Sequence, residues 1–590
     1  MAMFQIFSYP ITLRLSTFFL CFFLSFPLAA FDKEPILRVE GRMHTEPILR
    51  IATDSANSFF VSSSKDKTLR IWQLPSGRLR KIIRVPIAQG AEGELNAVAV
   101  SPDGVVIAAS GNTCKTLPSE KGYCIYLFDT ATGNILSRIK GLPATVLHLA
   151  ISHNNQYLAV AMSGKAGLRV YHLHNGRLLK KDKDYGGDTT WLDFNKNGAL
   201  ITTSLDGYLR LYDEHFKPQQ RKKLPTGFQP YSAKFSPEND KIAVGFTGRH
   251  VVIVFSAKDL KVLYFADDTA GVGDFRSVAW SKDGKALYGA GKHKNSRNSL
   301  IRWWKDAGRS GVSGWGEFID LPIYKSTISQ IITLKDGDIL YSGLAPVLGG
   351  VDNEGFLRFR RTKPIATFAR WKKSLLLSAD GSIVGFPYDK SGKNGGRFVA
   401  RDLILLNSKA VNDKLYAPIT KSKYFSVTGW EDKTGELKLN GVAIALADNE
   451  KVSSIAIARN NRFFVVGTSD KLRLLDRIGR ARWNSSVLAP VVGLNISLNN
   501  RVIVAAHSDG IIRWYRTVTG DHFLSLFPHR DKKRWVAWTP DRYFATSAGG
   551  GDILGWHKNR GVNRSAKFVS YANSKNSKLR LERINNLFAH

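Results

Sequence analysis

Short runs of alternating apolar and polar residues, separated by polar turns, organise nearly the whole chain after residue 40. The turns are rich in Ser, Pro, Asp, Gly and Asn, as in SPDG from Ser101 and SKDG from Ser281. Most successive turns are 39 to 53 residues apart. Alternation with a period of two indicates half-buried β-strands, and a repeat of about 40 residues indicates the blades of a β-propeller. The turns begin at Ser101, Ser152, Asn195, Ser236, Ser281, Leu334, Ser378, Ala458, Ser497 and Thr539.

A second strand follows many of these turns and ends in an aromatic residue. Strands rich in β-branched and aromatic residues are typical of packed sheets, so we assign these aromatic side chains to packing. In three repeats an Asp precedes the strand, at Asp66, Asp206 and Asp509, where its carboxylate can accept hydrogen bonds from turn N–H groups. The clearest strands are LRIWQ (69–73), IYLFD (125–129), LRVYH (168–172), LRLYD (209–213), VIVFS (252–256), IRWWK (301–305) and IIRWY (511–515).

The repeats predict an all-β chain that contains two adjoining β-propellers. The first is expected over residues 41–365 with about seven blades, and the second over residues 366–570 with about five to seven. A basic C-terminal tail follows at residues 571–590.

Two segments depart from the regular spacing. The interval from Ser378 to Ala458 is about twice the usual length, so we expect a degenerate blade around Lys421–Trp430. The N-terminal segment Glu34–Val39 is expected to pair with a later repeat and thereby close a ring.

The strands that end near Trp72, Asp129, Asp213 and Asp476 resemble WD40 repeats. The literal Trp-Asp pair is intact in none of them, since Gln73 follows Trp72 and the other three Asp residues follow Phe, Tyr and Leu. The resemblance is therefore in pattern and period. It implies a four-stranded antiparallel sheet for each repeat, with the sheets arranged radially.

A closer resemblance covers almost the whole chain after residue 30. The stretches MHTEPILRIATD from Met43 and VIVAAHSDGIIRWYR from Val502 are similar to repeats of bacterial proteins that join WD40-type propellers to a caspase-like peptidase domain. Such a peptidase needs a Cys nucleophile activated by a His, and the sequence has no cysteine after Cys124. The resemblance thus implies the propeller region without protease activity, and it makes a separate caspase-like peptidase a candidate partner.

The first thirty residues are typical of a secretory signal peptide. Arg14 precedes an uncharged run from Leu15 to Ala30, and small residues lie just before Phe31, where a signal peptidase could cut. We therefore expect residues 1–30 to be removed and the mature protein to be periplasmic or secreted. The alternative is an uncleaved anchor, although the run is short for a transmembrane helix.

Removal of the signal peptide leaves two cysteines. Cys114 and Cys124 bracket a short polar stretch, and a disulfide between them would staple this loop in an oxidising compartment. The alternative is a pair of unrelated thiols. Two cysteines are too few ligands for a structural metal site, so neither a metal nor a cofactor is expected.

Positive charge is in large excess, with 85 Lys and Arg against 49 Asp and Glu and a formal net charge of +36. Nucleic acid, anionic lipid head groups and acidic glycans would all be attracted by such a field. Basic residues gather around Trp371 at the expected junction of the propellers and form a candidate anion-binding site. The alternative is a solvated loop. The cluster comprises Arg358, Arg360, Arg361, Lys363, Arg370, Lys372 and Lys373.

The sequence carries no motif that predicts catalysis. It contains no GxSxG, no HExxH and no EF-hand loop. His172 and His174 alternate on one expected strand and so share a face, but no third metal ligand accompanies them.

Together these observations predict a non-catalytic scaffold that docks other proteins on its loop-built faces. Two alternatives stay open. One is a binder of anionic polymers through the basic surface, whose affinity would fall steeply with salt. The other is a propeller enzyme with an unrecognised site in its central channel, which would require inward-facing Asp, Glu or His side chains.

Overall fold

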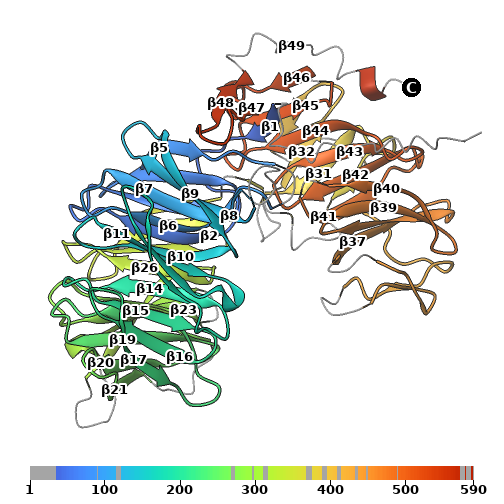
Figure 1. Ribbon diagram of the computed structural model, residues 1–590. Coiled ribbons are helices and arrows are strands. Elements are labelled where there is room, and N and C mark those ends of the chain that lie inside the picture. The colour runs from blue at the N-terminus through green and yellow to red at the C-terminus, as the bar shows by residue number, and fades with distance from the viewer. Residues whose placement is uncertain are drawn as a thin grey trace, which may run out of the picture.

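The computed structural model describes residues 35–588 with gaps, and nearly all of its elements are β-strands (Figure 1). The expected signal peptide, residues 1–30, lies outside the described residues. Among the described residues, no helix has the length and apolar character needed to span a membrane. The described helices are the short 3-10 turns η1 (Gly164–Ala166), η2 (Lys305–Gly308) and η4 (Asn586–Phe588). The gaps are 89–90, 115–120, 268–272, 296–297, 310–316, 364, 367, 369–374, 389–394, 408–413, 432–435, 447–449, 488, 542, 572–577 and 580–585.

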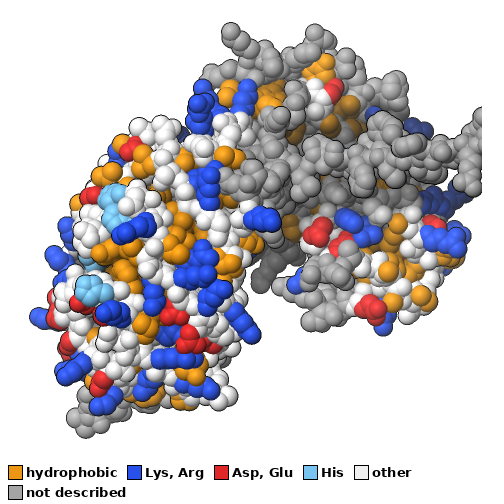
Figure 2. Space-filling model, in the orientation of Figure 1, with side chains coloured by type: hydrophobic (Ala, Val, Ile, Leu, Met, Phe, Trp, Pro, Cys, Tyr) orange, Lys and Arg blue, Asp and Glu red, His pale blue; other side chains and the backbone are white. Residues whose placement is uncertain are grey.

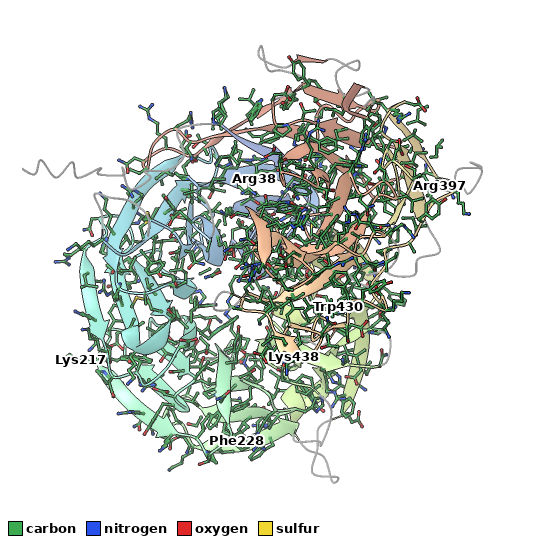
Figure 3. The ribbon with its side chains drawn as sticks, turned by 90° about the vertical axis from the view of Figure 1, so that its right-hand side faces the viewer. Arg38, Lys217, Phe228, Arg397, Trp430 and Lys438 are labelled. Atoms are coloured by element: carbon green, nitrogen blue, oxygen red, sulfur yellow. A yellow bond between two sulfur atoms is a disulfide. The ribbon has the colours of Figure 1, made fainter. Side chains whose placement is uncertain are left out.

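Seven four-stranded antiparallel sheets follow one another between Ile48 and Thr362. The first strand of each sheet contacts the first strand of the next, and β26 of the seventh sheet contacts β2 of the first. These contacts close a ring, which we call the first ring (Figures 1 and 3). Its sheets are β2 (Ile48–Thr53), β3 (Phe59–Ser64), β4 (Thr68–Gln73) and β5 (Arg78–Arg84); β6 (Glu94–Val100), β7 (Val106–Asn112), β8 (Tyr123–Asp129) and β9 (Ile135–Leu142); β10 (Val146–Ile151), β11 (Tyr157–Met162), β12 (Leu168–His172) and β13 (Leu178–Asp182); β14 (Thr189–Phe194), β15 (Leu200–Ser204), β16 (Tyr208–Tyr212) and β17 (Pro218–Lys223); β18 (Gln229–Phe235), β19 (Lys241–Thr247), β20 (Val252–Ser256) and β21 (Val262–Asp267); β22 (Ser277–Trp280), β23 (Leu287–Lys294), β24 (Ser299–Trp304) and β25 (Phe318–Tyr324); β26 (Ile328–Thr333), β27 (Ile339–Gly343), β28 (Val347–Val351) and β29 (Leu357–Thr362).

The recurring turn motif joins the first and second strands of a sheet. In the turn between β6 and β7, the Ser101 hydroxyl accepts a hydrogen bond from Val106 N at 2.8 Å and donates one to Asp103 Oδ1. Ser497 repeats the first contact, to Val502 N at 3.0 Å. A buried backbone N–H without a hydrogen-bond partner is unfavourable, so the serine hydroxyl stabilises the turn between the two strands. The same Ser-to-backbone contact is made at Ser152, Ser236, Ser281 and Ser378.

The three turn Asp residues have the contacts that the sequence predicts. Asp66, Asp206 and Asp509 each accept a hydrogen bond at 3.0 Å from the backbone N–H two residues later. The prediction that they fix hairpins is therefore confirmed. Each also lies near an Arg four residues on, and the Arg210–Asp206 pair is the shortest of these at 2.8 Å.

Aromatic side chains fill the space between the sheets, as expected. Trp72 is 1% exposed, and its indole N–H donates to Ser62 Oγ at 2.8 Å. Between the first and seventh sheets, Phe60 stacks on Phe359 with ring centroids 6.0 Å apart. Fully burying such a side chain contributes about 1.5 to 3 kcal/mol, so this contact helps to close the first ring.

The described strands after residue 366 form a second group of sheets, at the right of Figure 1. The expected degenerate repeat is present as a three-stranded sheet of two-residue strands, packed through the buried Trp430. The sheet that begins with β41 is extended beyond four strands by β45, β46 and β49. The strands are β30 (Leu376–Leu377), β31 (Ile383–Pro387), β32 (Gly395–Val399) and β33 (Ile404–Leu406); β34 (Val427–Thr428), β35 (Lys438–Leu439) and β36 (Val442–Ala443); β37 (Val452–Ile457), β38 (Phe463–Thr468), β39 (Lys471–Asp476) and β40 (Ala481–Ser486); β41 (Val491–Ile496), β42 (Val502–His507), β43 (Ile512–Arg516), β44 (His522–Pro528), β45 (Trp535–Trp538), β46 (Tyr543–Thr546) and β49 (Lys578–Leu579); β47 (Leu554–Lys558) and β48 (Lys567–Ser570).

The N-terminal strand β1 (Ile36–Val39) lies among the C-terminal strands, as its blue colour between red strands shows in Figure 1. It pairs antiparallel with β47, with Ile36 opposite His557 and Val39 opposite Leu554. The expected pairing with a later repeat is thus confirmed. Immediately after β1 the chain enters the first ring, so one sheet joins this early segment to the strands β47 and β48.

Candidate functional site

The first ring encloses a central cavity of about 580 Å³. Its walls are the first strands of all seven sheets, and its mouth is formed by the turns that follow these strands. The turn residues at the mouth include Asp54, Pro102, His153, Lys196, Pro237, Lys282 and Lys335.

A buried aromatic and cationic cluster lies across the middle of the ring. Arg50, on β2, donates a hydrogen bond to the carbonyl of Thr190 on β14 at 3.2 Å. Because β2 and β14 belong to the first and fourth sheets, the Arg50 side chain reaches across the ring. Its guanidinium lies 5.0 Å from the ring centre of Trp191 and 5.7 Å from that of Tyr231, within the range of cation–π attraction.

His148 completes this cluster from the third sheet. Its ring lies 4.1 Å from that of Trp191, centre to centre, and it lines the cavity. Burial, with the positive charges of Arg50 and Lys234, holds the pKa of His148 well below its usual value. The imidazole is therefore neutral at neutral pH. The charge of Arg50 also lowers the pKa of Tyr231.

Charges at the mouth are mostly positive. Lys196, Lys282 and Lys335 are exposed, whereas the two acidic residues of the lining are already engaged. Asp193 accepts from Lys234 Nζ at 2.6 Å, and Asp54 accepts from the backbone and hydroxyl of Ser58 in its own turn. The cavity can therefore receive acidic or aromatic groups. In the part of the chain that the structure describes, no three His, Cys, Asp or Glu residues are grouped to hold a metal ion.

Sequence reasoning did not identify the cavity residues, although the repeat contains a signal for them. The position four residues before each turn faces the ring interior, and polar or aromatic side chains replace small ones there in several repeats. The residues concerned are Arg50, His148, Trp191 and Gln330, before the turns at Asp54, Ser152, Asn195 and Leu334.

The predicted anion-binding cluster does not converge on one site among the described residues. Arg358 lies near the carboxylates of Asp338 and Asp352, at 3.3 and 3.7 Å, in turns of its own sheet. Arg360 donates weakly to a carbonyl of β25 and lies 5.4 Å from the ring centre of Tyr324. The next two basic residues, Arg361 and Lys363, donate hydrogen bonds to carbonyls outside this sheet.

Arg361 and Lys363 both donate hydrogen bonds to backbone carbonyls of other segments. Arg361 donates to the carbonyls of Gly77 and Ser76 in the first sheet, at 3.1 and 3.3 Å. Lys363 donates to Ser508 O at 2.7 Å, and burial lowers its pKa. These side chains are structural contacts in the folded chain. The remaining predicted residues, Arg370, Lys372 and Lys373, lie outside the described residues.

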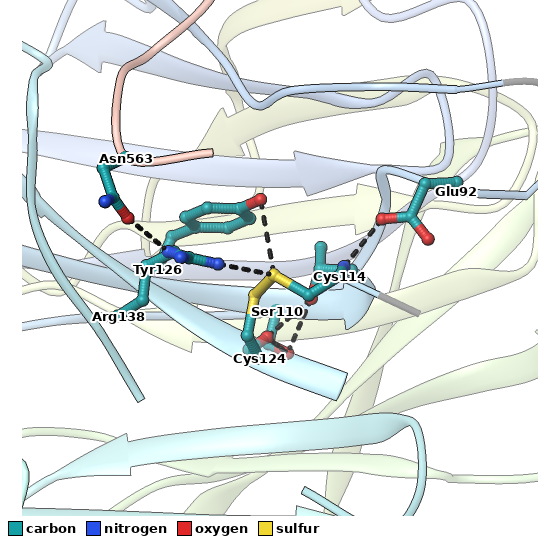
Figure 4. The surroundings of a disulfide bond; sticks show 8 residues. Glu92, Ser110, Cys114, Cys124, Tyr126, Arg138 and Asn563 are labelled. Atoms are coloured by element: carbon teal, nitrogen blue, oxygen red, sulfur yellow. Dashed lines mark hydrogen bonds between the residues drawn. A yellow bond between two sulfur atoms is a disulfide. The ribbon is translucent and has the colours of Figure 1, made fainter. Parts of the chain in front are cut away.

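Cys114 and Cys124 are joined by a disulfide at the end of the second sheet (Figure 4). The Cys124 carbonyl accepts from the hydroxyls of Ser110 and Thr113, at 2.7 and 2.6 Å. Arg138 lies between Cys114 Sγ, at 3.4 Å, and Asn563 Oδ1, at 2.8 Å. The disulfide itself therefore lies near a C-terminal segment of the chain, with Arg138 between them.

The surface outside the cavity is also basic. Figure 2 shows Lys and Arg side chains spread over the visible face of the first ring, with apolar side chains between them. The rings of His172 and His174 are 6.0 Å apart, centre to centre. His172 ends β12 and His174 lies in the turn after it, so the expectation that both lie on one strand is wrong. They are not part of the cavity lining.

Comparisons with known proteins agree with this architecture. The family model "WD domain, G-beta repeat" matches residues 37–73, which include β2, β3 and β4. Autophagy-related protein 16 of Arabidopsis thaliana is 24% identical over 256 residues, 42% of this chain and 46% of the relative. Protein ROOT INITIATION DEFECTIVE 3 of the same plant is 27% identical over 187 residues, 28% of this chain and 41% of the relative.

A third relative is small ribosomal subunit protein RACK1y of Oryza sativa subsp. japonica, 29% identical over 123 residues, 21% of this chain and 32% of the relative. The chain spans less than half the length of each of these relatives. The chain thus contains a stretch that matches the WD40 repeat, and these distant relatives are eukaryotic proteins. Proteins with these repeats are mostly non-catalytic and generally bind other proteins.

Proposed function

We propose that this chain is a non-catalytic scaffold that docks other proteins, built as two adjoining β-propellers and exported from the cytoplasm. The observation that carries the proposal is the mouth of the central cavity, where turns from all seven sheets form one rim. Turns held by a rigid ring present a fixed surface, which lowers the ordering cost of binding.

The charge at the mouth indicates the kind of partner. Lys196, Lys282 and Lys335 are exposed there, while the acidic lining residues are internally paired. A partner with an acidic loop would be steered to this face and would gain further contact with the aromatic cavity wall at Trp191.

The two propellers are proposed with boundaries at residues 41–365 and 366–570. The closed contacts of the first ring support the first propeller. The same serine turn joins the first two strands of two later sheets, at Ser378 and Ser497. These sheets support a second unit of the same kind. On the resemblance alone, a separate caspase-like peptidase is one candidate partner of this scaffold.

Export is proposed from the signal-like residues 1–30 and from the bonded Cys114–Cys124 pair, which suits an oxidising compartment. Mass spectrometry of the protein recovered from its native cells tests it. We expect a mature N-terminus at Phe31. An intact N-terminus in the soluble cytoplasmic fraction would contradict export.

Affinity capture from the envelope fraction tests the docking function. The mature chain is immobilised, and bound material is washed first at low and then at high salt. Protein partners that survive high salt are expected, and their capture should fall for a Lys196→Glu, Lys282→Glu, Lys335→Glu variant but not for Lys165→Glu, an exposed lysine outside the lining. Equal capture by both variants would overturn the assignment of this face.

A second function, binding of anionic polymers, is favoured by the same exposed lysines. It predicts that salt releases all bound material and that glycan, lipid or nucleic acid is found in the eluate. Release of this kind without any protein partner would replace the docking proposal.

A further inference from the structure

The outer edge of the first ring carries a second hollow, far from the mouth of the cavity. It is a groove of about 520 Å³ between β17, the last strand of the fourth sheet, and β20 and β21 of the fifth. Figure 3 places Phe228 of this groove at the rim of the ring. Its lining is mainly apolar and includes Leu224, Phe228, Ile253, Phe255, Val262 and Phe265.

Several of these apolar side chains are open to solvent. Val262 is 43% exposed and Phe265 37%, and both lie on β21, the outermost strand of its sheet. Their partners across the sheet, Phe255 and Ile253, are buried at the base of the groove. Scattered exposed apolar residues are ordinary on protein surfaces, but a grouped and hollowed set is typical of an interaction site.

Positive charge borders the groove. Lys222 of the lining shares a face of β17 with the groove, whereas the Lys223 ammonium lies 5.9 Å from the Tyr208 ring centre on the other face of that strand. The lining contains no carboxylate. Arg249 lies over the Phe228 ring at 4.5 Å, where its hydrogen bond to Gly227 O holds it. A nearby cation, Arg221, is instead paired with Asp184 at 2.7 Å. The groove thus combines an apolar base with an uncompensated basic edge.

We propose that this groove binds an extended, acidic and apolar segment of a partner protein. Apolar side chains of the segment would cover Val262 and Phe265, and its carboxylates would lie against Lys222 and Arg249. Charge complementarity selects this occupant, because a basic or neutral segment would leave the cationic edge unpaired. The groove is separate from the cavity mouth, so the scaffold would hold two partners on different faces.

Selection of random phage-displayed peptides on the full chain tests the proposal. We expect the enriched peptides to combine Leu or Phe with Asp or Glu. A synthetic enriched peptide is then measured by fluorescence polarisation. Binding should weaken about tenfold or more for a Lys222→Glu, Arg249→Glu double variant and for Val262→Asp, and should be unchanged for Leu136→Asp. Leu136 is a matched control, being 57% exposed on β9, the outermost strand of the second sheet.

The Lys222→Glu, Arg249→Glu variant keeps the test decisive if Val262→Asp does not fold. Absence of enriched peptides, enrichment of basic peptides, or equal binding by the groove variants and Leu136→Asp would overturn the proposal. The Lys196→Glu, Lys282→Glu, Lys335→Glu variant should bind the peptide normally. If that variant loses protein capture but still binds the peptide, the groove and the cavity mouth act as independent sites.

Discussion

At the scale of single residues, buried histidines make the stability of this fold depend on pH. His507 is fully buried, with Nδ1 2.8 Å from the Ala489 carbonyl and Nε2 3.3 Å from the Tyr515 hydroxyl. Burial lowers its pKa to about 3. The pKa values of His522 and His557 are lowered in the same way, to about 4 and about 3. These rings stay neutral in the folded protein across the mildly acidic range.

Replacing His507 by Asn should flatten the acid dependence of stability. The unfolded His507 takes up a proton below about pH 6.5 and the folded one does not, so its contribution is complete above pH 6.5 and is lost as the pH falls towards about 3. Asn keeps a donor for the Ala489 carbonyl and does not titrate. Between pH 6.5 and 4 the free energy of unfolding should therefore fall by about 1.4 kcal/mol less per pH unit than in the wild type.

Urea unfolding at pH 7 and pH 5 measures this difference. His215→Asn is the matched control, because the His215 side chain is 73% exposed. The explanation fails if the two variants show the same pH dependence.

At the scale of secondary-structure elements, the hydroxyl of a turn serine links the first and second strands of several sheets. Ser101 is fully buried and accepts from Val106 N. Ser101→Ala would leave that N–H without its partner at the start of β7, so we expect a loss of about 1 to 3 kcal/mol in the free energy of unfolding. Ser55→Ala, at an exposed turn position, should change it by less than about 0.5 kcal/mol. Urea titration followed by tryptophan fluorescence measures both; equal effects would show that the turn contact contributes nothing.

These local contacts explain how much of the fold could be predicted. Turn chemistry and strand alternation lie within one repeat, so the serine turns, the Asp66 hairpin and the degenerate repeat at Trp430 could be read from sequence. The cavity could not, because Arg50 and Trp191 come from different repeats and only ring closure brings them together.

The basic cluster shows the opposite failure, in which neighbours in sequence were expected to be neighbours in space. Arg358 is directed to Asp338 in its own sheet, whereas Lys363, five residues on, reaches Ser508 in the C-terminal half. A sequence gives the charge of each side chain but not the partner that neutralises it.

At the scale of the whole molecule, the segment after β1 joins the two halves. The Glu40 backbone N–H donates to Ile553 O, beside β47, and its carboxylate pairs with Arg70, at 2.8 Å, and with Arg84 of the first sheet. Glu40 and Arg70 side chains are only 11% and 3% exposed. One buried carboxylate thus holds the first ring against the sheet formed by β1, β47 and β48.

Glu40→Gln should weaken this junction. Gln keeps the size of the side chain but leaves the buried Arg84 guanidinium without its paired carboxylate and Arg70 with only the more distant Asp66, so we expect about 3 kcal/mol of destabilisation. Glu317→Gln removes an exposed pair with Lys305 and should cost less than about 1 kcal/mol. Differential scanning calorimetry of both variants compares them, and similar unfolding temperatures would rule out a structural role for the buried pair.

The central claim is that the mouth of the first ring docks other proteins. Cross-linking mass spectrometry with a lysine-reactive reagent, applied to the chain and its most strongly captured envelope partner, tests it most directly. The account predicts cross-links from Lys196, Lys282 and Lys335, which surround the mouth on three different sheets. Cross-links confined to the second group of sheets, with none from these three lysines, would contradict it.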